Sequence, residues 1–155
     1  MPLLPIPHRT EDFAGACLPA CCQMALALFS ITETQASIAA RIGHIQGAGT
    51  AARNITRLKA FGVEVRWYDN GLVSDVQRAI ADGSVPIVFL RTGELPYWDE
   101  DTPHAVVVVG IELDTVFVND PAFERAPIPV LIGDLQLAWN EFECQWATVR
   151  RLSEE

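Results

Sequence analysis

The chain has 155 residues, of which 50% are hydrophobic, and this length can bury roughly two thirds of the unfolded surface in one core. Its net charge of −9 leaves no basic stripe to neutralise phosphates, which argues against nucleic acid and anionic membrane surfaces as partners. The sequence shows no signal peptide pattern and no apolar run of membrane-spanning length, so we expect a single soluble domain over 1–155 in the cytoplasm.

The first predicted elements are an extended lead-in and a helix. Residues 1–14 carry three prolines, which predict extended chain because proline fixes φ and lacks an N–H. A helix is expected to begin near Cys17, since Pro19 suits a first turn and good helix formers follow it. This helix is apolar on almost every side, which predicts a central position in the fold.

Three short amphipathic helices are predicted next, at 32–43, 50–62 and 72–83. Each of these segments ends at a glycine, which is a common stop signal for a helix. A threonine is the N-cap candidate of the first two helices, and Ser74 is the candidate for the third.

The second half of the chain is rich in predicted strands. Helices that come before strands in this way indicate an α+β fold, with the N-terminal helices packed on an antiparallel sheet. The expected elements are an alternating strand at 63–68, a buried strand at 85–91 with its proline at the edge, a hairpin at 104–120 that turns at 112–114, a helix at 133–142 and a closing strand at 144–151.

Three of the four cysteines fall within residues 17–22. Cys17 lies where the lead-in becomes the helix, and the unpaired N–H groups and the helix dipole there favour a thiolate. Cys21 and Cys22 would lie one turn further on as small buried hydrophobes, and Cys144 is expected in the core or partly exposed. The cluster has poor geometry for disulfides, which favours a reducing compartment. Cys17 is therefore the best-placed nucleophile.

The hairpin supplies a histidine and a carboxylate. His104 opens its first strand and Asp120 ends its second, and folding the hairpin about residue 112 places the two side chains opposite each other on one face. A carboxylate in that position holds the imidazole in one tautomer and makes it a stronger base. A thiol activated by such a pair is the arrangement of cysteine acyl-transfer enzymes.

The segments "ACLPACCQMALALF", "HAVVVVG" and "VFVNDP" resemble, in order and spacing, the peptidase C39 family. This family of papain-like cysteine peptidases includes the double-glycine leader peptidase domains of bacteriocin export transporters. The resemblance covers most of the chain, from about Pro5 to the last strand. It implies a papain-like fold that acts on peptides, with Cys17 as nucleophile, His104 as general base and then acid, and Asp120 as the group that orients the imidazole.

The resemblance also has two departures. Members of the family carry a glutamine six residues before the nucleophile, where its amide helps to form the oxyanion hole, and here that position is Glu11. The glycine that usually follows the nucleophile is Leu18. Glu11 is thus the oxyanion candidate, and it is also the main support for an alternative, a catalytically impaired relative that binds peptides without cleaving them.

A zinc site is a further alternative. It would use Cys17, either Cys21 or Cys22, and His104, because a ligand pair at i and i+4 on one helix is feasible. Structural zinc sites usually show a compact second pair of ligands, which this sequence lacks. We therefore expect no metal and no cofactor.

The segment "RTGELPYWDEDTPH", residues 91–104, concentrates aromatic and acidic side chains in a predicted loop before His104. Tyr97 and Trp98 are substrate-binding candidates, because exposed aromatic side chains often lie at the rim of a binding site. The alternative is an ordinary solvated connection in which Trp98 covers the edge of the core. As a rim, the loop would favour basic or neutral peptides.

Overall fold

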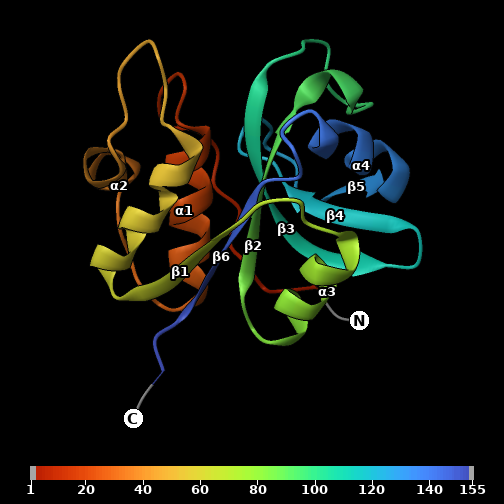
Figure 1. The fold of residues 1–155 in the computed structure, drawn as a ribbon. Coiled ribbons are helices and arrows are strands. Elements are labelled where there is room, and N and C mark those ends of the chain that lie inside the picture. The colour runs from red at the N-terminus through yellow and green to blue at the C-terminus, as the bar shows by residue number, and fades with distance from the viewer. Residues whose placement is uncertain (1–2, 154–155) are drawn as a thin grey trace.

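The computed structural model describes residues 3–153, and within that range six strands form one antiparallel sheet. The strand order is β1-β6-β2-β3-β4-β5, so the hairpin of β3 and β4 lies inside the sheet (Figure 1). Residues 1 and 2 of the expected lead-in, and the two ends of the expected domain, lie outside the described residues. The strands are β1 (Val63–Tyr68), β2 (Val85–Arg91), β3 (Pro103–Glu112), β4 (Thr115–Asn119), β5 (Ile128–Leu131) and β6 (Trp146–Arg151).

Helices cover both faces of this sheet, which gives three layers (Figure 1). The first face carries α1 (Cys17–Leu28), α2 (Gln35–Ile42) and the 3₁₀ helix η1 (Ala52–Phe61), and the second carries α3 (Val73–Ala81) and α4 (Ile132–Asn140). A short 3₁₀ turn, η2 (Thr92–Glu94), follows β2. The α+β class predicted from the element order is confirmed. None of the helices within residues 3–153 is long and apolar enough to cross a membrane.

Strands β2 and β3 are buried on both faces because both layers of helices pack on them. Ile87 and Val107 belong to the core under α1, whereas Val88 and Val106 belong to the core under α3 and α4. Successive side chains of a strand point to opposite faces, so a strand between two apolar layers needs apolar residues at every position. This explains the unbroken run "AVVVV" in β3.

The helix boundaries confirm the predicted threonine cap and glycine stop of α2, but the prediction that Thr50 caps the next helix is wrong, because its N-cap is Ala51 and makes no side-chain cap hydrogen bond. Thr34 caps α2 by accepting a hydrogen bond from the Ser37 backbone N–H, and the helix ends at Gly43 in the left-handed region, at φ 76°. The prediction that Ser74 caps α3 is wrong. The N-cap is Leu72, because the Asp75 carboxylate accepts the Leu72 backbone N–H at 2.9 Å and thus satisfies the start of the helix.

The predicted helix at 50–62 is a 3₁₀ helix, η1, that spans Ala52–Phe61. The side chains that it buries against the core are Ile55 and Leu58, with Phe61 partly buried. A spacing of three residues matches the three residues per turn of a 3₁₀ helix, so this geometry keeps all three side chains on one face.

The β3–β4 hairpin confirms the predicted turn but contains an irregularity. The register shifts between Val108 and Gly110, and the N-terminal segment crosses the sheet there, with the Leu4 N–H donating to Val109 O at 2.7 Å. Leu3 packs directly over Gly110, where any side chain would collide with it. The bulge therefore docks the lead-in onto the sheet.

Two features of the sheet differ from the sequence predictions, namely strand β5 and the position of Pro86. Strand β5 has only four residues and was not predicted. Pro86 is the second residue of β2 and lies across from Thr148, so it occupies the end of an interior strand and not an edge of the sheet.

Candidate active site

Four predicted residues meet where α1 approaches the starts and ends of the hairpin strands. Glu11 comes from the N-terminal segment, Cys17 is the first residue of α1, His104 is the second residue of β3 and Asp120 directly follows β4. One side-chain polar atom from each of Glu11, Cys17 and His104 lies within 4.8 Å of the other two. The fold thus brings together residues that are about a hundred positions apart in the sequence.

Cys17 is the cysteine that reaches the site. Its N-cap residue is Ala16, whose side chain offers no acceptor to the N–H groups of the first helical turn. Cys21 and Cys22 are fully buried, as predicted, and burial raises the pKa of both thiols. Cys21 donates to the Ala105 carbonyl at 3.4 Å and so faces the backbone of β3. The structure brings neither Cys21 nor Cys22 into the predicted zinc set.

His104 and Asp120 form the predicted pair, and both are buried. His104 Nε2 donates to Asp120 Oδ1 at 2.6 Å. The two residues are not directly opposite, however, because Val107 pairs with Asn119 and this register would place Asp120 across from Val106. His104 therefore reaches its partner along the diagonal of the same face, a distance that a ring side chain can span.

The Asp120 carboxylate accepts three more hydrogen bonds. The Ala122 N–H donates to Oδ1 at 2.9 Å, Tyr97 Oη donates to Oδ2 at 2.8 Å and Trp98 Nε1 donates to the same oxygen at 2.9 Å. Trp98 also packs edge-on against the His104 ring, with the ring centroids 4.9 Å apart. Neither Tyr97 nor Trp98 lines the cleft that opens beside Cys17. A substrate-contacting role for these two residues stays a prediction.

These contacts shift the protonation of the pair. Burial opposes the charge on His104, but the hydrogen bonds with Asp120 and Cys17 and their negative charges raise the pKa of His104 to about 9. Burial would also raise the pKa of Asp120, but the hydrogen bonds from His104, Ala122 and Trp98, together with the His104 charge, hold that pKa below its ordinary value. The pair therefore favours an imidazolium beside a carboxylate at neutral pH.

Glu11 is held in place by its neighbours in the chain. The Glu11 N–H donates to the Pro121 carbonyl at 2.9 Å. Gln35, which is fully buried, donates to the Thr10 carbonyl at 2.8 Å and accepts the Asp12 N–H at 2.9 Å. Burial raises the pKa of Glu11, His104 partly opposes that rise and Asp120 adds to it. Sequence reasoning missed Gln35, whose only signal was a polar residue on a helix.

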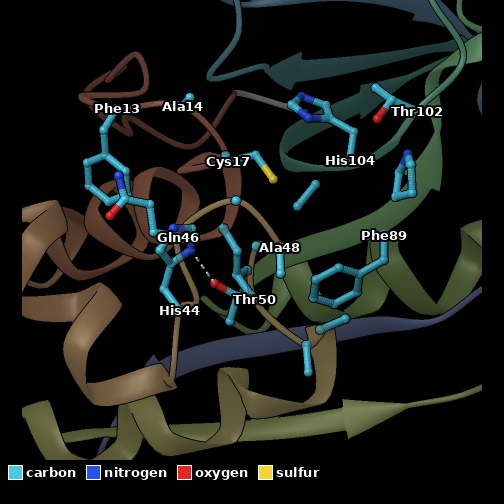
Figure 2. A pocket seen from close by; sticks show the side chains of 18 of the residues that line it. Phe13, Ala14, Cys17, His44, Gln46, Ala48, Thr50, Phe89, Thr102 and His104 are labelled. Atoms are coloured by element: carbon cyan, nitrogen blue, oxygen red, sulfur yellow. Dashed lines mark hydrogen bonds between the residues drawn. The ribbon is translucent and has the colours of Figure 1, made fainter.

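A cleft of about 1050 Å³ opens beside the nucleophile. Cys17 and His104 face it from α1 and β3, and the loop 44–52 forms another wall (Figure 2). This loop is closed by a bridge between Ile45 and Gly49 and by a hydrogen bond of 3.0 Å between His44 and Thr50. Sequence reasoning missed the loop, although its small residues, "GAG", signal a place where another chain can approach closely.

Comparison with known proteins gives one family and several similar folds. A model of the Peptidase_C39-like family matches residues 4–153, and no curated protein matches the chain. A structure classed as a C39-like peptidase from Bacillus anthracis is 14% identical, with a TM-score of 0.78 and coverage of 98% of each chain.

Two other solved structures are similarly close in fold. A double glycine motif protease from an AMS/PCAT transporter, in complex with its leader peptide, is 16% identical, with a TM-score of 0.73 and coverage of 97% of this chain and 94% of that chain. The peptidase domain of Streptococcus ComA, a bifunctional ABC transporter, is 15% identical, with a TM-score of 0.74 and coverage of 94% and 98%. The fold is thus the papain-like fold of C39 peptidases, and the chain belongs to the Peptidase_C39-like family.

Proposed function

We propose that this protein is a cysteine peptidase that works through a covalent acyl-enzyme. The observation that carries the proposal is the buried hydrogen bond between His104 Nε2 and Asp120, which leaves the other ring nitrogen for the thiol of Cys17. A base that is oriented by a third group, next to a nucleophile at a helix start, is the arrangement that nucleophilic catalysis requires.

The reaction follows from these positions. Cys17 Sγ attacks the peptide carbonyl carbon, and the carbonyl oxygen takes the negative charge. His104 then donates its proton to the leaving amine as the C–N bond breaks, and a thioester with Cys17 remains. His104 next takes a proton from water, the resulting hydroxide equivalent attacks the thioester, and the acid is released with the thiol restored.

Glu11 is the proposed side-chain donor to the oxyanion, together with backbone N–H groups at the start of α1. Its carboxyl group lies within 4.8 Å of the Cys17 sulfur, close to where the charge would develop. A carboxylic acid can donate a hydrogen bond only while it is protonated, and the burial that raises the pKa of Glu11 favours that form.

A peptide is the proposed partner. Support comes from the cleft beside Cys17 and from the similar protease that was solved with its leader peptide. The second candidate function is a peptide-binding protein without turnover, because an ionised Glu11 would repel the oxyanion. The cytoplasmic location and the single domain over 1–155 stay predictions.

The experiment that tests the proposal is reaction with a peptidyl chloromethyl ketone, followed by mass spectrometry of all four cysteines. We expect modification of Cys17 alone, at a rate that saturates with probe concentration, and loss of that reaction in Cys17→Ala. Cys144 is the internal control, because it is the other partly exposed thiol and it lies away from the cleft lining.

Two results would contradict the peptidase assignment. One is equal modification of Cys17 and Cys144, which would mean that Cys17 is an ordinary thiol. The other is saturable binding of a fluorescent peptide with no modification of Cys17 by the electrophile, which would favour the peptide-binding alternative.

A further inference from the structure

Three different kinds of metal ligand converge at the start of α1. They are the Glu11 carboxylate, the Cys17 thiol and the His104 imidazole, and among residues 3–153 they form the one such cluster whose ligand atoms all lie within 4.8 Å of one another. We propose that these three residues form a zinc site, through which the metal reversibly occupies the nucleophile. This site differs from the zinc set considered in the sequence, because Glu11 takes the place of a second cysteine.

The ligand types favour zinc over other common divalent ions. Zinc binds thiolate, imidazole and carboxylate, whereas magnesium and calcium prefer oxygen ligands alone. Metal–ligand bonds of about 2.0–2.3 Å around a tetrahedral zinc place neighbouring ligand atoms roughly 3.3–3.8 Å apart. The three ligand atoms lie within 4.8 Å of one another, so no pair has to approach by more than about 1–1.5 Å to reach that spacing.

The surroundings of His104 suit a metal ligand. A ligating histidine usually donates its second ring N–H to a carboxylate, which fixes the tautomer and raises its basicity. Here His104 Nε2 donates to Asp120 at 2.6 Å, which leaves Nδ1 as the free ligand atom. Asp120 is itself held by Tyr97 and Trp98, so the imidazole is already oriented before any metal arrives.

The backbone of Glu11 is fixed as well. Hydrogen bonds run from the Glu11 N–H to Pro121 and from Gln35 to both neighbours of Glu11. The entropy lost on binding is therefore confined mainly to the side chain. Cys17 and His104 line the cleft, so a metal ion can enter from solvent and keep a water molecule as its fourth ligand.

Zinc binding would change the chemistry of the site in a defined way. Zinc takes the deprotonated form of each ligand, so the proton that Cys17 and His104 share and the carboxyl proton of Glu11 pass to solvent as the zinc–sulfur, zinc–nitrogen and zinc–oxygen bonds form. Neither Cys17 nor His104 can then act in peptide hydrolysis. The inhibitory effect rests on the proposed peptidase function, whereas the metal binding does not, and a chelator would restore the free thiol.

Cobalt titration of the reduced, full-length protein tests the metal site without any peptide. We expect a near-ultraviolet thiolate-to-cobalt charge-transfer band and visible bands of four-coordinate cobalt, which saturate at one equivalent and disappear when zinc is added. Magnesium and calcium should leave the bands unchanged. No charge-transfer band in the parent protein, or a band that survives in Cys17→Ala, would overturn the proposal.

Variants distinguish a metal site that includes the Glu11 carboxylate from one made by the Cys17 thiol and the His104 imidazole alone. Glu11→Gln should weaken cobalt binding by at least tenfold, because an amide is a poor ligand, and Asp120→Asn should weaken it by about 10–100-fold through the loss of the carboxylate behind His104. Cys144→Ala should bind cobalt like the parent. Unchanged affinity in Glu11→Gln would remove Glu11 from the site and so contradict the proposal.

Alkylation by iodoacetamide gives a second measurement that needs no spectrum. Zinc should slow the modification of Cys17 at least tenfold, while Cys144 in the same molecule reacts at an unchanged rate. Equal rates at Cys17 with and without zinc would contradict the site. Because neither readout uses a peptide, a protein that binds zinc but fails to react with peptidyl probes would disprove the peptidase proposal alone.

Discussion

At the scale of single residues, Asp120 determines what the candidate site can do. It is fully buried, and each carboxylate oxygen accepts two hydrogen bonds. A buried carboxylate with fewer partners would either take up a proton or destabilise the fold. The four donors therefore keep Asp120 ionised and aim it at His104, and we infer that Tyr97 and Trp98 act through it as positioning residues.

Tyr97→Phe removes one of these donors and keeps the ring. We expect the unfolding free energy to fall by about 1.5–3 kcal/mol, because the hydrogen bond is made to a charged group. In reaction with the peptidyl chloromethyl ketone, the maximal rate kinact should drop several-fold while the half-saturating concentration KI stays the same. Tyr68→Phe is the matched control, since Tyr68 stacks on Trp146 away from the cleft lining.

This experiment also decides between the two roles considered for the loop. If Tyr97 contacts the peptide, as the sequence alone suggested, its substitution should raise KI and leave kinact close to that of the parent. That outcome would contradict a positioning role.

Glu11 gives a second prediction, about pH. The raised pKa of Glu11, caused mainly by burial, keeps the carboxyl group protonated to higher pH, and we expect its donation to the oxyanion to be lost as the pH rises through that pKa. Glu11→Gln keeps a donor at every pH. The ratio of its inactivation rate to that of the parent should be near one below the Glu11 pKa and increase as the pH rises through it, towards the ~10²–10³ that one oxyanion donor is worth.

The pH profile has a clear negative outcome. If Glu11 points away from the reacting carbonyl, Glu11→Gln and Glu11→Ala should both follow the parent profile from pH 5 to pH 9. The backbone N–H groups at the start of α1 would then stabilise the oxyanion alone.

At the scale of elements, the sequence predicted those whose signal is local. The start of α1, the end of α2 at Gly43 and the β3–β4 hairpin follow from caps, prolines and β-branched runs. Long-range contacts decided the rest. The bulge beside Gly110 lies where the N-terminal segment packs on β3, and a contact between residues about a hundred positions apart leaves no local pattern in the sequence.

The site was predictable to the same extent. Cys17, His104 and Asp120 could be named because each lies at the start or end of a strongly patterned element. The diagonal placement of His104 and Asp120 could not be predicted, since it depends on the register in which the two hairpin strands pair. The contacts of Tyr97 and Trp98 with Asp120 come from a loop of irregular structure, where neither period nor cap indicates a direction for the side chain.

Gln35 connects α2 to the N-terminal segment that carries Glu11, and its substitution tests that connection. Gln35→Leu leaves the Thr10 carbonyl and the Asp12 N–H without their partner in α2, and a buried polar group without a partner costs about 1–3 kcal/mol. We expect lower thermal stability and, at temperatures where the variant is fully folded, a reduced kinact because Glu11 is no longer held. Gln23→Leu is the control.

The control works because Gln23 contacts the same network without touching the residues beside Glu11. It accepts from Gln35 at 2.9 Å and donates to the Glu33 carbonyl. A loss of kinact in Gln23→Leu equal to that in Gln35→Leu would show that general loosening of α2, and not the position of Glu11, sets the rate.

At the scale of the whole molecule, the buried ion pair links stability to pH. The folded-state pKa of His104, about 9, lies above its ordinary 6.5, so its stabilising contribution is full below pH 6.5 and is lost as the pH rises through about 9. Asp120, whose pKa is lowered, contributes above its ordinary 3.8, and that contribution is lost as the pH falls through its folded-state pKa. Stability should therefore be highest between these limits.

Chemical denaturation of the parent and of His104→Gln across pH 6 to 10 measures this contribution. The parent should lose unfolding free energy over this range by an amount on the order of a few kcal/mol more than the variant. Parallel curves for the two proteins would mean that His104 is neutral in the folded state at pH 7.

The distance along the chain between Cys17 and His104 has a consequence for the protein during its synthesis. Roughly ninety residues separate them, which at about 5–20 residues per second corresponds to several seconds of translation. During that interval the chain carries the thiol without its base, because His104 in β3 has not yet been made. Under the proposed function, the nascent chain therefore carries a cysteine that does not yet attack peptides around it, and we expect reactivity to begin when the hairpin joins the sheet.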